Sequence, residues 1–453
     1  MIRTGLRIEL RRSSALWIGL LVLVSSTAML VLLTAEDAKW QNNSTSALLN
    51  LRVPLAYVWA LVVGVAVFQG MRDSRARVGE LFSTTPRPNW VRLGTLATAV
   101  AGLAAVATLL LCVGLVVRVA LRGGFVSIGF VPLMVTVVLA LAASVVMGLA
   151  VGRLLPHPLI VPVALVATFM AASGWALRGL DSPDAEVPRW LLLGPVLDPP
   201  SSDLVTTSTS VDVGQVVWFT GLGVTAFLLL VSRSLRGHLV ALVPAGLALA
   251  LALSILPSKL SDVLVTDSLA GQMVCDGQVC VSRVHEDSLP TAAAVGREVL
   301  EKLAVLPDPP TKVWEDTSPM AHVEVPRRSG DIVYVSSQTY PDVLAMSPEQ
   351  MRLDLLAGAG VPRCASPNTV DAGEATVRYV TAGYFNGKLA VLASDPYVWG
   401  SSRMRAEVEE AWQAFRGQSA QEQLNRVTKA REMLLTCQDS ERVLDVLVAG
   451  AVR

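Results

Sequence analysis

Apolar residues form seven long runs in the first 256 positions of the chain, and shorter polar stretches separate these runs. The runs cover residues 15–34, 53–70, 93–117, 128–152, 158–177, 214–232 and 239–256. About 20 apolar residues are enough for a helix to cross the hydrocarbon core of a bilayer. The pattern therefore predicts a polytopic α-helical membrane domain of about seven transmembrane helices over residues 1–256.

Two of these boundaries need an argument. The first run is longer than the apolar core of a signal peptide, and no small-x-small cleavage site precedes Ala35, so we expect a retained span. Only Arg153 and the corner Pro156-His157-Pro158 divide the fourth run from the fifth. A single helix over both would be far longer than a span requires, so we expect two helices.

The pattern changes after residue 256. Residues 288–306 have the period of an amphipathic helix, and residues 319–325 and 331–337 alternate like strands. From 403 to 449 the pattern is helical throughout. We expect residues 257–453 to form a small α-rich α+β domain.

Composition agrees with a membrane protein. The chain is 52% hydrophobic and 16% charged, whereas soluble domains carry about 25% charged residues. The zero formal net charge hides an asymmetry, because residues 1–256 hold 18 basic and 11 acidic residues and the remainder holds 19 and 26. The two parts are therefore expected to face different surroundings.

Arginine placement predicts the orientation, since cytoplasmic loops are rich in Lys and Arg. Twelve arginines fall in the loops of one side, and only Lys39, Arg52, Arg122 and Arg189 fall clearly in the loops of the other. The twelve are Arg3, Arg7, Arg11, Arg12, Arg72, Arg75, Arg77, Arg87, Arg92, Arg153, Arg233 and Arg236. This predicts a multi-pass protein of a bacterial plasma membrane with its N-terminus inside and residues 257–453 outside.

Cysteines support the outward placement of the second domain. Cys112 lies in the third run, and the other four cysteines all follow residue 257. An even number of cysteines in an extracytoplasmic domain suggests disulfides. Of three possible pairings we favour Cys275–Cys280 and Cys364–Cys437, because Asp-Gly-Gln-Val between the first two suits a hairpin turn. Four separate thiols remain the alternative.

Motifs for catalysis, metal binding or nucleotide binding are incomplete. His285-Glu286 lacks the second histidine of a zinc peptidase, and no histidine stands at ligand spacing from a cysteine pair. Ser336 and Ser337 lack a Gly-x-Ser-x-Gly frame, and Asn386-Gly387-Lys388-Leu389 is not a P-loop. We expect no enzyme activity, no metal, no cofactor and no nucleic-acid partner, so any ATP must be bound by another subunit.

The seven runs, as bounded above, contain no Asp, Glu, Lys, Arg or His. Proton-coupled transporters commonly need such groups within the membrane. The pattern thus disfavours proton coupling and intramembrane catalysis alike.

One cytoplasmic segment has a composition suited to a partner. As a helix over residues 72–84, it places Val78, Leu81 and Phe82 on one face, surrounded by charges, and Pro86 ends it. Such a helix fits a groove on a soluble protein, and the alternative is a basic loop that only sets topology. The candidate coupling residues are Arg75, Arg77, Val78, Gly79, Glu80, Leu81, Phe82 and Pro86.

The stretch RVGELFSTTPRPNWVRLG resembles the first cytoplasmic loop of ABC-2-type transporter permeases, and LRIELRRSSALWIGLL, residues 6–21, resembles their amphipathic N-terminus. The resemblance implies a permease subunit that pairs with a second permease, as a homodimer or heterodimer. A separate ABC ATPase would move the coupling helix and drive export of a small-molecule or peptide-like compound.

The chain also departs from that family. A seventh span and an outer domain follow the six-helix core, an arrangement that resembles actinobacterial permease-like proteins with an extracytoplasmic tail. Residues 187–199 resemble the family's re-entrant or interfacial helices, and an ordinary loop with an apolar patch is the alternative. A different functional class also fits: a membrane-anchored sensor or assembly protein whose outer domain binds a ligand or partner.

Overall fold

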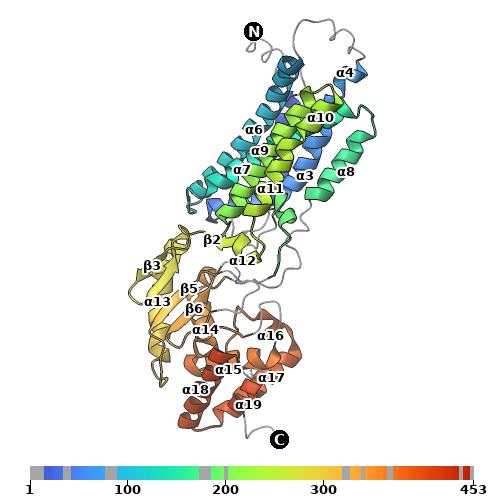
Figure 1. The fold of residues 1–453 in the computed structure, drawn as a ribbon. Coiled ribbons are helices and arrows are strands. Elements are labelled where there is room, and N and C mark those ends of the chain that lie inside the picture. The colour runs from blue at the N-terminus through green and yellow to red at the C-terminus, as the bar shows by residue number, and fades with distance from the viewer. Residues whose placement is uncertain are drawn as a thin grey trace. The chain divides into compact units, whose positions relative to one another are not determined.

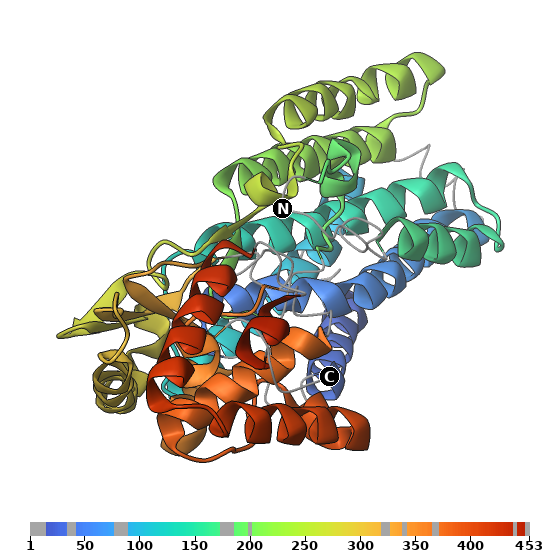
Figure 2. The same cartoon turned by 90° about the horizontal axis from the view of Figure 1, so that it is seen from below.

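A computed structural model of the chain separates into two compact units, Met1–Asp267 and Ser268–Arg453 (Figures 1 and 2). It describes residues 15–33, 42–76, 89–172, 185–197, 202–318, 327–337, 342–364, 371–437 and 442–448. The predicted strand at 319–325 lies outside these ranges. Each unit has its own elements and core, and we describe them separately.

The first unit is helical. Its helices are α2 (Ala15–Leu33), α3 (Ser44–Gly70), α4 (Arg72–Arg75), α6 (Asn89–Leu121), α7 (Phe130–Leu154), α8 (Ile160–Ala172), α9 (Thr209–Val231), α10 (Leu235–Ala241), α11 (Val243–Ile255) and α12 (Leu260–Val263). A short 3-10 helix, η2 (Arg189–Leu193), lies between α8 and α9.

Five helical segments of the described residues are long and apolar enough to cross a membrane. They are α3, most of α6, α7, α9 and the continuous stretch Leu235–Ile255. The first and fifth predicted spans coincide with α2 and with the 13-residue α8, respectively. The chain is therefore consistent with a membrane protein, while a seven-span arrangement stays a prediction.

Several helices begin earlier than the apolar runs predict. The second run starts at residue 53, yet α3 starts at Ser44 and continues through Pro54. Asn43 caps this earlier start by accepting a hydrogen bond from Thr45 N. Pro54 suggests a helix start because proline is favoured in a first turn, but the buried neighbours of α3 support the helix on both sides of it.

Glycines bring α3 and α7 into close contact. A Cβ atom at Gly148 would lie 2.7 Å from the Ala66 Cβ atom, and one at Gly152 would overlap the Val67 carbonyl oxygen. Small residues allow such an approach between membrane helices, where dispersion contacts replace the hydrophobic effect. The two helices run in the same direction, since Ser44 also lies beside Ser127 near their other ends.

The same device joins α9 to α11. A Cβ atom at Gly221 would overlap Ala248, and one at Gly214 would come within 2.8 Å of Leu256. These two contacts are two helical turns apart on α9. Glycines of α9 therefore let the antiparallel helix α11 approach closely at these two positions.

A buried polar cap closes one end of this bundle. Strands β1 (Val205–Thr207) and β2 (Leu264–Thr266) pair antiparallel there. The Asn43 side-chain amide donates to the Asp203 carbonyl at 2.7 Å, and Ser46 Oγ donates to the Val205 carbonyl at 3.0 Å. Helix α3 is thus fastened to the segment that precedes α9.

The second unit is built on a four-stranded mixed sheet. Its strands are β3 (Met273–Asp276), β4 (Val279–Ser282), β5 (Lys312–Asp316) and β6 (Ile332–Ser336), in that order. Strands β3 and β4 form an antiparallel hairpin, and β4, β5 and β6 are parallel. Gly277, at φ +63°, starts the two-residue turn because this conformation costs glycine little.

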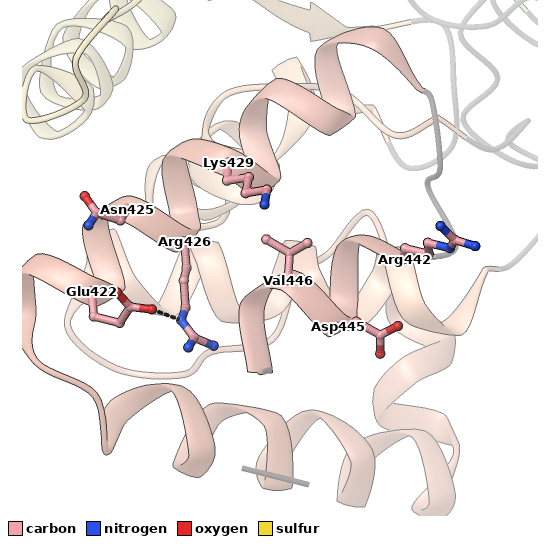
Figure 3. A pocket seen from close by; sticks show the side chains of 7 residues that line it. All are labelled: Glu422, Asn425, Arg426, Lys429, Arg442, Asp445 and Val446. Carbon is pink, nitrogen blue, oxygen red and sulfur yellow. Dashed lines mark hydrogen bonds and ion pairs between the residues drawn. The ribbon is translucent and has the colours of Figure 1, made fainter. Parts of the chain in front are cut away.

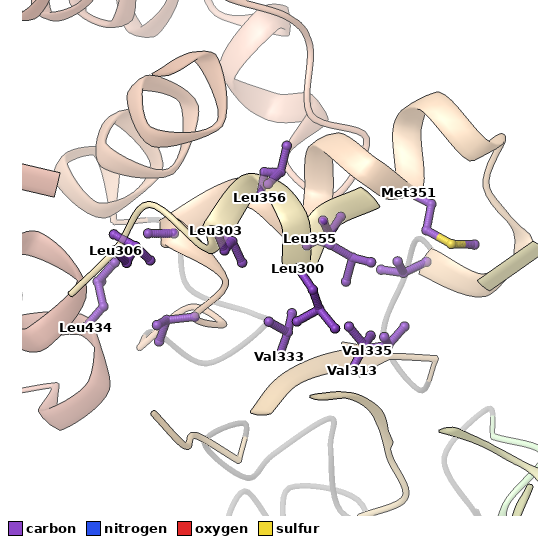
Figure 4. Close-up of a cluster of buried hydrophobic side chains, with 14 of the residues drawn as sticks. Leu300, Leu303, Leu306, Val313, Val333, Val335, Met351, Leu355, Leu356 and Leu434 are labelled. Carbon is purple, nitrogen blue, oxygen red and sulfur yellow. The ribbon is translucent and has the colours of Figure 1, made fainter. Parts of the chain in front are cut away.

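Helix α13 (Leu289–Leu303) connects β4 to β5 and covers the sheet, close to the predicted range 288–306. Figure 4 shows Leu300 and Leu303 of α13 facing Val333 and Val335 of β6. All four side chains are buried. The amphipathic pattern of α13 therefore serves a βαβ core, in which one apolar face of the helix packs on the sheet.

Helices complete the unit. They are α14 (Pro348–Leu356), α15 (Ala372–Asn386), α16 (Pro396–Gly400), α17 (Ser402–Arg416), α18 (Ala420–Thr436) and α19 (Val443–Val448), with 3-10 turns η3 (Arg283–Ser288), η4 (Val343–Ala345) and η5 (Ala357–Ala359). The predicted helical stretch over 403–449 is divided into the helices α17, α18 and α19. Ser419 caps a new helix after Gly417, and Cys437 ends α18 in a left-handed conformation.

Both disulfides favoured from the sequence are the ones in the structure. Cys275 and Cys280 lie directly opposite each other on β3 and β4 and are bonded. Cys364 is bonded to Cys437, which joins the segment after η5 to the end of α18. Cys112, the fifth cysteine, is free and buried in α6.

Candidate functional site

The structure describes only the beginning of the predicted coupling segment. Helix α4 is a single turn, and within it the Arg75 guanidinium lies 3.7 Å from the centre of the Phe68 ring and donates to the Phe68 carbonyl. The remaining candidate coupling residues lie outside the described residues: Arg77, Val78, Gly79, Glu80, Leu81, Phe82 and Pro86. Their helical conformation stays a prediction.

The two ends of that segment are held together by an ion pair. Asp73 lies near the start of the segment and Arg92 follows it in the first turn of α6, and Arg92 Nη2 lies 2.8 Å from Asp73 Oδ2. Arg72 Nε lies 3.5 Å from the other Asp73 oxygen. The side chains of Asp73 and Arg92 are about three-quarters buried, so water screens this pair less than a pair on an open surface.

Further arginines surround this ion pair. Arg153, near the end of α7, interacts electrostatically with Asp73, Arg92 and Arg233. These residues come from four different parts of the first unit, although all belong to the loops predicted inside. The described part of the predicted cytoplasmic face is therefore an arginine cluster centred on one carboxylate.

A second polar cluster lies inside the bundle, and the sequence argument missed it. Arg52 is completely buried in α3, and its Nη2 donates to the Gln215 Oε1 of α9 at 2.8 Å. The sequence argument places Arg52 in a loop because the apolar run starts one residue later. Helix α3 begins at Ser44 and includes Arg52, so the prediction that the spans lack charged side chains is wrong for this helix.

Gln215 connects Arg52 to η2. The Gln215 amide nitrogen donates to the carbonyls of Leu192 and Gly194, at 2.8 and 2.9 Å. The segment 187–199, expected to be a re-entrant or interfacial helix, thus contains the five-residue 3-10 helix Arg189–Leu193, and its carbonyls reach the bundle. Trp190 within it is exposed.

Two other groups complete the surroundings of Arg52. Asp212 of α9 and Cys112 of α6 are its electrostatic neighbours. Asp212 Oδ1 accepts a hydrogen bond from Thr207 at 2.8 Å. The Asn43-Ser44-Thr45 sequence is the signal that could have revealed the cluster, because Asn43 is a helix cap nine residues before Arg52.

The second unit contains a buried carboxylate with several donors. Glu315 of β5 accepts hydrogen bonds from the Ser282 backbone at 2.6 Å and from Ser337 Oγ at 2.5 Å, and it lies 2.8 Å from His285 Nδ1. Ser282 Oγ is 3.1 Å from the same His285 nitrogen. A catalytic triad needs the acid and the serine on opposite ring nitrogens, so this geometry favours a structural network.

A second buried acid lies between α14 and the loop before α16. Asp354 Oδ1 accepts hydrogen bonds from the Ser394 backbone and hydroxyl, while Asp354 Oδ2 has no hydrogen-bond partner. Burial raises the pKa of Asp354, and the Ser394 hydrogen bonds and Arg378 oppose that change. Nearby, burial also raises the pKa of Tyr379, whose hydroxyl donates to the Asp395 carbonyl.

An open hollow of about 440 Å³ lies between α18 and α19 (Figure 3). Its walls are Glu422, Asn425, Arg426, Lys429, Arg442, Asp445 and Val446. Glu422 and Arg426 pair with each other at 2.6 Å, and charges of both signs line the hollow. The ion pair and mixed charges match an ordinary solvated surface better than a selective ligand site.

Comparison with known proteins identifies no relative of this chain. No family model matches, and neither the curated proteins nor the solved structures contain a match.

Proposed function

We propose that the chain is the membrane-spanning permease subunit of an ATP-driven exporter in a bacterial plasma membrane. A separate ABC ATPase subunit would bind the segment around Glu80 and Phe82, and a second permease subunit would complete the path. The Asp73–Arg92 ion pair carries this proposal, because it ties both ends of the coupling segment to membrane helices.

The ion pair and the close helix packing would transmit a movement of the coupling segment to the membrane helices. A displacement of the segment 77–88 would move the end of α3 and the start of α6 together, since the ion pair joins them. Helix α3 would in turn displace α7, whose Gly148 and Gly152 contact it without intervening side chains. Packed elements of this kind transmit motion as rigid bodies.

Co-purification of an ATPase subunit tests the proposal. In the full chain produced with its cellular partners, wild type should co-purify an ABC ATPase, and the complex should hydrolyse ATP. Glu80→Gln combined with Phe82→Ala should abolish co-purification, whereas Arg122→Gln, an exposed arginine of the opposite loops, should not. Absence of an ATPase from the wild-type preparation would rule the proposal out.

Charge-swap variants of Asp73 and Arg92 test the role of the ion pair in the same experiment. Asp73→Arg and Arg92→Asp should each reduce ATP hydrolysis per complex several-fold, and the double variant should restore it. Restoration identifies the interaction itself, because the double variant keeps both charges and exchanges their positions. Equal losses in the single and double variants would contradict the coupling role.

The alternative, a membrane-anchored sensor or assembly protein, has one supporting observation. The second unit is a separate compact body with its own core and both disulfides, as expected of a ligand-binding outer domain. This alternative predicts normal function in cells that lack the ATPase. The same co-purification experiment therefore separates the two functions.

A further inference from the structure

Arg52 occupies a position where an arginine is costly. It lies about 12 Å along α3, a helix about 40 Å long, so it falls inside a hydrocarbon core of about 30 Å when the helix is centred there. Its side chain is 0% exposed, so it does not extend to water at the membrane surface. An ionisable residue at such a depth is ordinarily paired or functional.

The hydrogen bonds of Arg52 are incomplete. Nη2 donates to Gln215, but Nε and Nη1 have no hydrogen-bond partner. Gln215 is neutral, and its amide group is already used by Leu192 and Gly194. Two buried guanidinium donors are therefore left without an acceptor among the residues that the structure describes.

Neighbouring acids do not satisfy those donors. Among the residues that the structure describes, no carboxylate lies within ion-pair distance of Arg52. Asp212, its acidic neighbour, is instead hydrogen-bonded to Thr207. The guanidinium thus keeps a positive charge and has N–H groups on Nε and Nη1 that no described residue accepts, and such groups form charge-assisted hydrogen bonds with carboxylates.

Beyond Gln215, Asp212 and Cys112, buried aliphatic side chains lie close to Arg52 along the same helices. Leu48 and Leu55, one turn away on either side of α3, are buried, and so is Leu115, one turn from Cys112 on α6. A ligand at Arg52 would therefore meet one cationic group, the polar side chains of Gln215 and Asp212, and aliphatic side chains. This combination recognises an amphiphile with a single negative group.

We propose that Arg52 is the anion-binding residue of a ligand site between α3, α6 and α9, and that this site takes compounds with a carboxylate or similar monoanionic group on an apolar body. Movement of η2 with Gln215 exposes the site, because the hydrogen bonds from Gln215 to Leu192 and Gly194 hold the segment over it. The assignment rests on the proposed export function and gives its substrate a chemical class.

Cys112 provides a built-in reporter. It is an electrostatic neighbour of Arg52, and the other four cysteines are bonded in pairs. In the unreduced full chain, a thiol reagent therefore reports the surroundings of Arg52 alone. Two methanethiosulfonates of similar size and opposite charge, the sulfonatoethyl and trimethylammonioethyl compounds, serve as probes on protein in lipid vesicles.

The anionic reagent should modify wild-type Cys112 at least about tenfold faster than the cationic one, because the unpaired guanidinium attracts it. Arg52→Gln should remove this preference and Arg52→Lys should keep most of it. Arg122→Gln makes the same charge change at an exposed position and should leave the ratio unaltered. An equal rate for both reagents, or no modification by either, overturns the proposal.

A second measurement uses the wild-type protein, so its result does not depend on whether a variant folds. Sodium benzoate should slow modification of Cys112 by the neutral methyl methanethiosulfonate, and benzamide at the same concentration should not. Equal protection by both, or by neither, again contradicts an anion site. The ATPase co-purification assay is independent, so charge selectivity without an ATPase keeps the site and removes the exporter, whereas the reverse removes only the substrate class.

Discussion

Glu315 of β5 accepts a 2.6 Å hydrogen bond from the backbone N–H of Ser282, the last residue of β4. The same carboxylate faces His285 and Ser337, and all four residues are at least nine-tenths buried. Buried carboxylates are costly unless several donors satisfy them. This network therefore joins the ends of β4, β5 and β6 through one side chain.

Glu315→Gln should destabilise the second unit by about 3 kcal/mol, because its amide N–H₂ turns one buried acceptor into a donor that faces another donor. The measurement is thermal unfolding of the full chain, followed by tryptophan fluorescence. Glu298→Gln is the matched control, since Glu298 is substantially exposed and forms an ion pair with Arg352. A shift no larger than that of the control would show that the network contributes little.

Asp354 predicts a pH dependence of stability. Burial raises its pKa in the folded state, so the folded protein binds this proton more tightly than the unfolded chain. Its stabilising effect is then fully present below the ordinary aspartate pKa of about 4 and is lost as the pH rises through the raised value.

Asp354→Asn removes this titration and keeps an oxygen for Ser394. The unfolding free energy of wild type relative to this variant should therefore fall as the pH rises from about 4. Chemical denaturation at several pH values measures the difference. A flat difference across that range, or one that grows with pH, would contradict the raised pKa.

Gly152→Ala should weaken the contact between α3 and α7. The new Cβ atom would overlap the Val67 carbonyl oxygen, a backbone atom that cannot move aside by a side-chain rotation. Overpacking typically costs about 1–3 kcal/mol. Gly114→Ala in α6 is the matched control, since a Cβ there meets nothing within 4 Å, and we expect it to be neutral or slightly stabilising.

Thermal unfolding of both glycine variants in lipid nanodiscs gives the comparison. Similar unfolding temperatures for the two variants would show that the close contact between α3 and α7 does not stabilise the folded protein. A loss confined to Gly152→Ala would support the close contact on which the proposed coupling route depends.

The Cys364–Cys437 disulfide should be the more stabilising of the two. Its cysteines are 73 positions apart, and closing a loop of that length lowers the unfolded-state entropy by about 4 kcal/mol in free energy. Replacing both residues by serine should therefore lower the unfolding temperature far more than the same change at Cys275 and Cys280, which are 5 positions apart.

Mass spectrometry of the unreduced chain provides the accompanying measurement. It should detect both disulfides and a single thiol at Cys112. Four free thiols in the second unit would contradict an extracytoplasmic location for residues 268–453.

Much of the fold could be predicted from periodicity. The apolar runs locate the long helices of the first unit, and the amphipathic pattern of 288–306 locates α13, because burial of one face or of a whole segment leaves a direct trace in residue order. The ends of the helices could not be predicted as well from the sequence. The start of α3 depends on Asn43, whose side chain is held by Asp203, far away along the chain.

Some features of the candidate sites could likewise be predicted from the sequence, and others could not. The basic segment 75–86 and the paired cysteines are visible in the sequence, since they depend on local composition and on turn chemistry. The pairing of Asp73 with Arg92 requires two helices to meet at one end. No periodic pattern encodes such a meeting, because it depends on how the helices pack.

By itself, the sequence determined that the chain is rich in membrane-length apolar helices, that a separate mixed domain follows them, and which cysteines suit a hairpin. These properties are local and repeat along the chain. Only the tertiary structure decided that Arg52 is buried against Gln215, 163 positions away, with two donors unpaired. The side-chain environment of a buried charge is set by elements brought together in space, and its desolvation appears only when the bundle has packed.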